Sequence, residues 1–136
     1  MIRKRTKSRE LALQFLYQYD LRGNEILDSI DDFLKESAKE PEIKDYCIKL
    51  IEGTIKNRKT IDEKISKQAR NWSIYRMPVI DRNVLRLAIF EMEQNEVPMP
   101  VIINEAIELG KKFSTEQSGS FINGLLDKIF SSIKKT

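Results

Sequence analysis

The sequence predicts an all-α protein, folded as a compact bundle of about seven helices that form two helical sub-bundles. The chain has only five Gly and four Pro among 136 residues, and no segment of any length alternates apolar and polar residues as a half-buried strand does. Its composition, 40% apolar and 33% charged, is that of a soluble globular protein. We therefore expect one domain, spanning residues 1–136, with a core of its own.

The first helix is expected from about Thr6 to Leu21, where apolar residues recur at helical spacing. Gly23 follows it and is suited to the left-handed conformation that ends many helices. Residues 1–6 form a basic arm ahead of this helix. A helix continued back to Arg5 would aim that side chain into the apolar stripe, so we expect the arm to leave the helix and to be flexible.

Three further helices are expected over residues 26–37, 42–57 and 60–71. The last of these opens with the sequence TIDE, in which Thr60 and Glu63 can form a capping box, each satisfying a backbone donor of the other. The residues that follow, up to position 77, form a connection between the two sub-bundles.

The fifth helix, over residues 78–94, differs from the others because apolar residues surround nearly its whole circumference. Pro78 fits its first turn, where the missing N–H group has no helical partner to lose. Such a helix belongs at the centre of a bundle, with its neighbours packed around it. The apolar residues are Ile80, Val84, Leu85, Leu87, Ala88, Ile89, Phe90 and Met92.

The last two helices are amphipathic. The sixth follows the loop EVPMP and runs to about Phe113, and the seventh starts at Ser118 or Ser120 and reaches the C-terminal lysines. Gly124 lies inside the seventh helix, where glycine costs roughly 1 kcal/mol relative to alanine. We therefore expect another group to approach its backbone closely.

The composition argues against an enzyme. The chain has no histidine, the commonest general base, and its one cysteine, Cys47, can form neither an internal disulfide nor a thiolate zinc site. Phosphate-binding loops, dinucleotide fingerprints and nucleophile motifs are missing as well. We therefore expect no catalytic residue, no metal and no cofactor. No apolar stretch is long enough to span a membrane, and a single cysteine suits the cytoplasm.

Positive charge is concentrated at the N-terminus. Residues 1–10 have a net charge of +4, whereas the whole chain has only +3. A local cluster of cations suits a polyanion, because each phosphate that it neutralises releases counterions. A solvated tail is the simpler interpretation. A transit peptide is disfavoured, because cleavage here would remove the core-forming helix that begins within a few residues of the charges.

Two aromatic residues lie at the edges of apolar stripes. On a helical wheel Tyr17 and Arg9 are about 80° apart and both lie outside the main apolar arc, so both are expected near the surface. Phe121 has a similar place in the seventh helix, and the amides of Gln117 and Asn123 lie near it in the sequence. Exposed rings beside cations are typical of single-stranded nucleic acid binding. The alternative is that both rings cover the edge of the core.

Arg82 and Arg86 lie four residues apart in the otherwise apolar fifth helix. They repel each other unless a carboxylate joins them. An internal carboxylate is favoured over one from a partner, because buried charges are normally paired within the fold. Asp81 lies in the first turn, where the helix dipole favours a negative charge. The carboxylates that alternate with lysines, among them Asp62 and Glu105, are expected on the solvated surface.

Three parts of the chain resemble the NusB family of transcription antitermination factors. They are RELALQFLYQYD at residues 9–20, DRNVLRLAIFEM at residues 81–92, and VIINEAIELGKKF with FINGLLDKI at residues 101–113 and 121–129. The resemblance implies a non-enzymatic RNA-binding domain of the bacterial cytoplasm. Such proteins pair with NusE, a protein of the small ribosomal subunit. The pair binds the boxA element of nascent RNA, so that RNA polymerase transcribes ribosomal RNA operons without premature termination.

The resemblance also implies site residues, with one side of the RNA surface on the arm and first helix and the other on the last loop and helix. The RNA-binding residues are Lys4, Arg5, Lys7, Arg9, Tyr17, Gln117, Phe121 and Asn123, and the NusE-binding residues are Asp81, Arg82 and Arg86. Lysines stand at two of the five cationic positions of the arm, which favours phosphate contacts over bidentate base contacts. The alternative function is a helical protein–protein interaction module whose basic arm is not an RNA site. The free protein is either a monomer or a homodimer.

Overall fold

Helices make up nearly the whole structure. The computed structural model describes residues 2–70 and 73–134, and within these ranges it contains α-helices, two short 3-10 helices and no strand. The α-helices are α1 (Ile2–Arg22), α2 (Ile30–Ser37), α3 (Pro41–Lys56), α4 (Arg58–Gln68), α5 (Val79–Gln94), α6 (Met99–Phe113) and α7 (Glu116–Lys134), and the 3-10 helices are η1 (Gly23–Ser29) and η2 (Ile74–Arg76). The predicted all-α fold class is confirmed.

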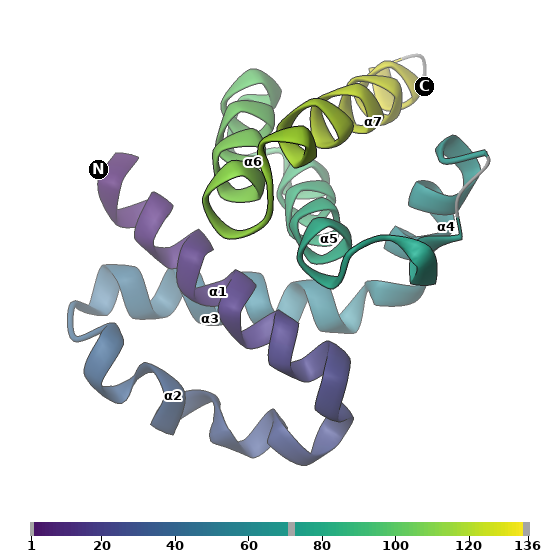
Figure 1. Cartoon of the computed structure of the whole chain (residues 1–136). Coiled ribbons are helices and arrows are strands. Elements are labelled where there is room, and N and C mark those ends of the chain that lie inside the picture. Colours follow the sequence, from purple (N-terminus) through teal and green to yellow (C-terminus); the bar gives the residue numbers. More distant parts are fainter. Residues whose placement is uncertain (1, 71–72, 135–136) are drawn as a thin grey trace.

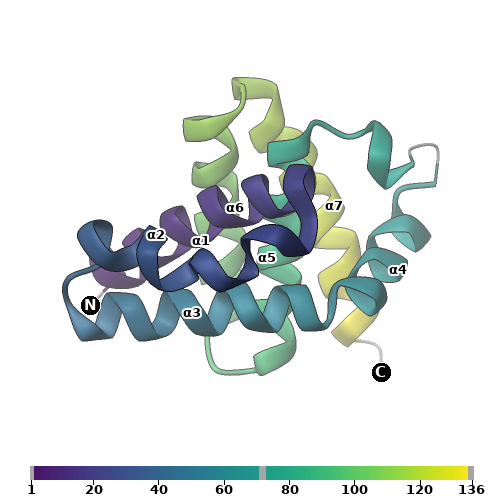
Figure 2. The ribbon, with the colours of Figure 1, turned by 90° about the horizontal axis from the view of Figure 1, so that it is seen from below.

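The helices form two groups that share α5 (Figure 1). In the first group α1 packs along α3, with α2 beside them, and the view turned by 90° shows α3 running along the length of this group (Figure 2). In the second group α6 packs on α7, and α4 contacts α7. α5 contacts α1, α3, α4, α6 and α7. Every residue from 81 to 92 is buried, so the expected central helix is confirmed.

Glycines permit close packing at two helix crossings. A Cβ atom at Gly53 of α3 would overlap the ring of Phe90 on α5, and one at Gly110 of α6 would overlap Ile122 on α7. Because protein interiors are close-packed, neither position has room for a side chain in the observed arrangement. Gly124 differs from both, since it is exposed and no described atom lies within 4 Å of a Cβ built there. The close approach expected at Gly124 is therefore not found.

The arm is part of the first helix, so the expectation that it leaves the helix before Thr6 is wrong. α1 begins at Ile2 and ends at Arg22, and the φ of 74° at the next residue, Gly23, confirms the expected left-handed terminator. The guanidinium of Arg5 lies 4.4 Å from the centroid of the Tyr46 ring on α3. A cation is attracted to the face of an aromatic ring, so Arg5 is accommodated on the side of α1 that faces α3.

Two other helix starts differ from the prediction. The expected second helix divides into η1 and α2, and α4 begins at Arg58. The hydroxyl of Thr60 donates to the backbone carbonyl of Asn57 at 3.0 Å, so it does not form the expected capping box. The expected end of this helix and start of the connection fall partly on Asn71 and Trp72, which lie outside the described residues.

The start of α7 lies earlier than predicted. α7 begins at Glu116, and the hydroxyl of Thr115 accepts a hydrogen bond of 3.2 Å from the backbone N–H of Ser118. Thr115 thus caps the helix, and Ser118 lies in its first turn. Across the described ranges, none of the helices combines the length and the apolar character needed to span a bilayer.

Candidate nucleic-acid interface

The outer side of α1 carries an exposed cation and an exposed aromatic ring. Lys7, Gln14 and Tyr17 share this side of the helix, and Lys7 and Tyr17 are about 15 Å apart along its axis. Tyr17 is 38% exposed, which confirms that it lies near the surface. Lys7 is exposed and makes no ion pair with the described part of the chain. The structure therefore places these residues where an extended ligand can reach both.

Lys4 lies on the side of α1 that faces the start of α3. Its Nζ atom is 3.1 Å from Oε2 of Glu40 and 3.3 Å from Oε1 of Glu42. Hydrogen bonds from Lys4 to Glu40 and Glu42 raise the pKa of its ammonium group. All three side chains are substantially exposed, and exposed ion pairs contribute little to stability. The two carboxylates therefore reduce the positive charge that Lys4 offers to a phosphate group.

Arg9 is buried, so the expectation that it lies near the surface is wrong. It is 3% exposed. Its Nε and Nη2 atoms donate to the two carboxylate oxygens of Glu91 on α5, at 2.7 and 2.9 Å, and Nη1 donates to Glu105 on α6 at 2.7 Å. Burial acts to lower the pKa of Arg9, but the hydrogen bonds and charge of Glu91 outweigh it and the pKa is raised. The guanidinium faces carboxylates of its own chain.

Glu91 is the centre of this buried cluster. The hydroxyl of Tyr46 on α3 also donates to Glu91, so the carboxylate links α1, α3 and α5. Burial raises the pKa of Tyr46, and the hydrogen bond to Glu91 raises it further. The cluster holds the N-terminal half of α1 in a fixed place on the bundle.

Asp20, near the end of α1, joins both arginines of α5. Arg82 donates to its two carboxylate oxygens at 2.7 and 3.0 Å, and Arg86 donates to Oδ2 at 2.9 Å. The prediction that an internal carboxylate joins these arginines is confirmed. Burial acts to raise the pKa of Asp20, but hydrogen bonds from Arg82 and Asn83 and the charge of Arg86 outweigh it, and the pKa is lowered.

Two carboxylates expected on the solvated surface are instead partners of buried arginines. Asp62 on α4 accepts hydrogen bonds of 2.8 and 3.0 Å from Arg86, and Glu105 accepts one from Arg9. Their side chains are only 17% and 19% exposed. The alternation with lysines in the sequence was misleading, because it does not show which neighbouring helix covers each position.

The three residues that the resemblance places near the NusE contact, Asp81, Arg82 and Arg86, are buried in this structure. Asp81 is 3% exposed, and the Ser118 hydroxyl, which donates to it, lies 3.0 Å from both of its carboxylate oxygens. Arg82 and Arg86 are directed to Asp20. Tyr75 of η2 is 64% exposed, and the guanidinium of Arg82 lies 5.3 Å from its ring centroid. Sequence reasoning missed Tyr75 because it lies in the connection, outside any periodic stripe.

The predicted residues of α7 divide between two sides of the helix. Gln117 is exposed and Phe121 is partly buried against the core. They are four residues apart and share one side of α7, whereas Asn123, which is exposed, lies about 160° away from Phe121. The structure therefore does not bring Asn123 together with the other two.

Residues at the end of α6 lie next to the exposed side of α1 and extend that surface. Lys112, near the end of α6, pairs with Glu10 of α1 at 2.8 Å, and its Nζ atom lies 5.4 Å from the ring centroid of Phe113. The chain then turns into α7, which begins three residues after Phe113. The exposed side of α1 is thus continuous with the turn that leads into α7, whose second residue is Gln117.

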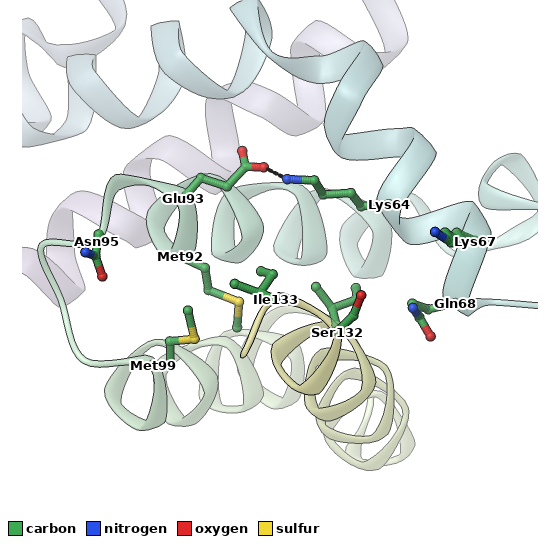
Figure 3. A pocket seen from close by; sticks show the side chains of 10 residues that line it. Lys64, Lys67, Gln68, Met92, Glu93, Asn95, Met99, Ser132 and Ile133 are labelled. Atoms are coloured by element: carbon green, nitrogen blue, oxygen red, sulfur yellow. Dashed lines mark hydrogen bonds and ion pairs between the residues drawn. The ribbon is translucent and has the colours of Figure 1, made fainter. Parts of the chain in front are cut away.

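Two hollows lie near opposite ends of α5. One, of about 600 Å³, has side chains of α4, α5, α6 and α7 around it, with Met92 and Met99 on one side (Figure 3). Lys64 at its edge is neutralised by an ion pair with Glu93, which disfavours a phosphate there. The other hollow, of about 270 Å³, lies beside Tyr17.

Cys47 is a core residue. It is fully buried in α3, and burial raises the pKa of its thiol to about 12. The thiol is therefore protonated at neutral pH, and a thiol is a far weaker nucleophile than a thiolate.

The comparisons with known proteins agree with one another. The model of the NusB family matches residues 6–131. The chain is 46% identical to the transcription antitermination protein NusB of Anaeromyxobacter dehalogenans over 134 residues, which cover 98% of this chain and 94% of that protein. It is 43% identical to NusB of Thermoanaerobacter pseudethanolicus over 123 residues, which cover 90% of this chain and 86% of that protein.

Solved structures share the arrangement of helices. NusB of T. maritima is 37% identical, with a TM-score of 0.82 over 92% of this chain and 89% of that chain. A chain in the crystal structure of the antitermination factors NusB and NusE in complex with dsRNA is 29% identical, with a TM-score of 0.88 over 97% of this chain and 99% of that chain. This chain therefore belongs to the NusB family.

Proposed function

We propose that this protein is a transcription antitermination factor. It binds a boxA-type single-stranded leader RNA together with NusE, and so helps RNA polymerase to transcribe ribosomal RNA operons. The observation that carries the proposal is the outer side of α1, where the cation of Lys7 and the ring of Tyr17 are both exposed. Family membership supports it, as does a similar chain crystallised with NusE and dsRNA. The role is non-catalytic, needs no cofactor, and belongs to the bacterial cytoplasm.

On this surface the residues have different roles. Lys4, Arg5 and Lys7 bind phosphates, and Tyr17 stacks on a base, as aromatic residues do in proteins that bind single strands. Gln117 and Phe121 extend the surface onto α7. Arg9 acts through the position of α1, because its hydrogen bonds to Glu91 and Glu105 hold in place the helix that presents the cations. Asn123, on the other side of α7, is a further residue proposed to contact the RNA.

The NusE contact is proposed at the surface next to the buried residues 81–86. Tyr75 is exposed there, and Arg82 lies behind its ring. Aromatic residues are enriched at protein interfaces, where they supply apolar area and a hydroxyl. In this arrangement Arg82 holds the backbone of Tyr75 by donating a hydrogen bond to its carbonyl oxygen, while Arg86 and Asp81 bind other groups of the bundle.

One observation favours the alternative function, a protein–protein interaction module. Lys4 and Arg9 already have carboxylate partners within the chain, which reduces the positive charge available to RNA. The two functions differ in the effect of removing two exposed cations of α1, Arg5 and Lys7. A variant with Arg5→Ala and Lys7→Ala loses RNA affinity if the protein binds RNA there, and keeps its main interaction if it does not.

A titration of labelled RNA tests the proposed function. A boxA-like RNA and a scrambled RNA of equal length are titrated with the protein, with and without NusE, at two salt concentrations. We expect tighter binding to the boxA-like RNA, further tightening by NusE, and weaker binding at higher salt. Lys35→Ala removes one exposed cation from α2, a different helix, and is the control for charge alone. Equal affinity for the scrambled RNA in the presence of NusE overturns the proposal.

A further inference from the structure

The segment around α4 carries a second concentration of positive charge. Residues 56–70 hold six cations and two carboxylates, a net charge of +4, which equals the net charge of residues 1–10. Figures 1 and 2 show α4 and the start of α1 at opposite sides of the molecule. The proposed RNA surface therefore does not include this second basic segment. Its cations are Lys56, Arg58, Lys59, Lys64, Lys67 and Arg70.

The hollow of about 600 Å³ separates α4 from the C-terminal ends of α5 and α7. Its apolar side includes Met92, Met99 and Ile133, which Figure 3 shows close together, with Lys67 of α4 across from them. Methionine side chains are flexible and polarizable, and they are frequent at surfaces that bind varied apolar groups. We propose that this hollow binds an acidic, amphipathic segment of a further protein partner. Apolar side chains of the segment lie on the methionines, and one of its carboxylates pairs with Lys67.

The charge of the hollow selects an acidic segment over a basic one. Lys67 is exposed and makes no ion pair with the described part of the chain. Lys64 is instead paired with Glu93, the one carboxylate among the described residues that line the hollow. The lining therefore keeps one net positive charge, next to the basic segment of α4. Complementary charges steer association and suppress wrong partners, so a segment with carboxylates beside its apolar side chains matches this site.

The lining also favours a protein segment over RNA. None of the described lining residues is aromatic, whereas single-stranded nucleic acid binds through bases stacked on aromatic rings together with a groove of cations. The volume of the hollow lies within the range of about 300–1,000 Å³ that is usual for ligand sites, so it has room for more than one side chain of a partner. Gln68, Asn95 and Ser132 add polar groups to the lining, and these can bind the backbone of the segment.

The hollow is separate from both surfaces of the proposed function. Met92 lies about 15 Å along α5 from Arg82, beside which the NusE contact is proposed. None of the described lining residues belongs to α1, which presents the cations to RNA. A segment in the hollow can therefore be bound at the same time as RNA and NusE. The inference goes beyond the proposed function, because it gives the protein a third partner.

The test uses the full chain and two labelled probe peptides. Both have leucines at the spacing i, i+3, i+4 and i+7, which places apolar anchors on one side of a helix. The other positions are mostly glutamate in the first peptide and mostly lysine in the second. In fluorescence anisotropy titrations we expect the acidic peptide to bind, more weakly at higher salt, and the basic peptide not to bind. No binding of the acidic peptide at millimolar protein, or equal affinity for both peptides, overturns the site.

Two substitutions locate the binding. Lys67→Glu replaces an attractive charge by a repulsive one and should weaken binding of the acidic peptide by about 3- to 10-fold. Met99→Ala removes apolar contact area and should weaken it by about 5- to 30-fold. Thermal denaturation checks the fold of both variants, and Lys67→Glu carries the test if Met99→Ala fails to fold, because Lys67 is exposed. Unchanged affinity in the folded variants overturns the site.

Lys35→Glu is the matched control, because it reverses an exposed charge on α2, which is not part of the lining. It should leave the affinity for the acidic peptide unchanged, and an equal loss in Lys35→Glu and Lys67→Glu overturns the site.

The titration is repeated with NusE and a boxA-like RNA at saturation. Unchanged affinity for the acidic peptide supports a third partner, whereas displacement of the peptide by NusE or by RNA overturns it. Sedimentation of the wild type and Lys67→Glu tests a second copy of this chain as the occupant, and a dimer that Lys67→Glu dissociates overturns the proposal. Binding of the RNA without any peptide tests the proposed function separately, so that function stands if only the peptide fails to bind.

Discussion

Arg9 on α1 and Glu91 on α5 are joined by two parallel hydrogen bonds of 2.7 and 2.9 Å, although 82 residues separate them. Both side chains are less than 5% exposed. Truncation of one partner leaves the other as an uncompensated buried charge. We therefore expect Arg9→Ala to lower the free energy of unfolding by about 3–5 kcal/mol, measured by urea denaturation. An Arg9→Ala variant with wild-type stability and weakened RNA binding contradicts the buried role.

Lys7 gives the opposite expectation, because it is exposed and makes no ion pair with the described residues. Lys7→Ala should leave the free energy of unfolding within about 0.5 kcal/mol of the wild-type value. It should reduce the slope of log affinity against log salt by about 0.7, the value for one phosphate contact to a single strand. Binding titrations at four salt concentrations measure this slope. An unchanged slope places Lys7 outside the RNA contact.

Tyr17 is expected to contribute through its ring. Tyr17→Ala should weaken RNA binding by about 1–3 kcal/mol, the range for one base stacked on an aromatic side chain. Tyr17→Phe should keep most of the affinity, since the ring remains. Fluorescence anisotropy with a labelled boxA-like RNA measures both variants, and thermal denaturation checks that they fold. If the two variants lose equal affinity, the hydroxyl is the group that matters.

The pKa of Asp20 makes stability depend on pH. This pKa is lowered in the folded protein, so the unfolded chain binds the proton more tightly. The stability that Asp20 contributes is therefore full above its ordinary pKa of 3.8 and is lost as the pH falls through the lowered value. Asp20→Asn should lower the free energy of unfolding by about 3–5 kcal/mol at neutral pH, and this difference should shrink below about pH 4.

The control for Asp20 is an exposed pair on the same stretch of chain. The Nε atom of Arg22 lies 2.9 Å from Oε1 of Glu25, and both side chains are more than half exposed. Glu25→Gln should change the free energy of unfolding by less than about 1 kcal/mol at any pH. Urea denaturation of the wild type and both variants between pH 3 and pH 7 makes the comparison. A constant difference between Asp20→Asn and the wild type over this range contradicts the lowered pKa.

Two glycine substitutions should have opposite effects. Gly53→Ala places a methyl group against the buried ring of Phe90, so we expect a loss of about 1–3 kcal/mol, as for other overpacked cores. A methyl group at position 124 would meet no other described atom. Gly124→Ala should therefore stabilise the protein by up to about 1 kcal/mol, because alanine favours a helix more than glycine does. Thermal denaturation ranks the two variants against the wild type. A stabilised Gly53→Ala variant contradicts the packing described at this crossing.

The helices could be predicted from the sequence because each depends on local features. The apolar circumference of α5 predicted its central place, and Gly23 predicted the end of α1. The 3-10 geometry of η1 was not predicted, because a segment of seven residues is too short for apolar spacing to distinguish a 3-10 helix from an α-helix. The arm was wrongly separated from α1 because a helical wheel contains no neighbouring helix, and the ring of Tyr46 on α3 is what accommodates Arg5.

The candidate site was harder to predict for the same reason. The surface position of Tyr17 followed from the wheel, but Arg9, which the wheel also placed outside the apolar arc, is buried beneath α5 and α6. Its partners, Glu91 and Glu105, are more than 80 residues away, and only tertiary packing brings them together. The carboxylate that joins the two arginines of α5 was correctly expected to come from this chain. No local pattern, however, identified Asp20 as that carboxylate.

The continuous helix from Ile2 to Arg22 also affects how quickly RNA can bind. Fixing the backbone of one residue costs about 1–2 kcal/mol of conformational entropy, and in α1 this loss has already occurred when the protein folds. The cations are therefore preorganised at helical spacing before any RNA arrives. Association needs no coupled folding step at the N-terminus, so its observed rate in stopped-flow mixing should rise linearly with RNA concentration and show no plateau.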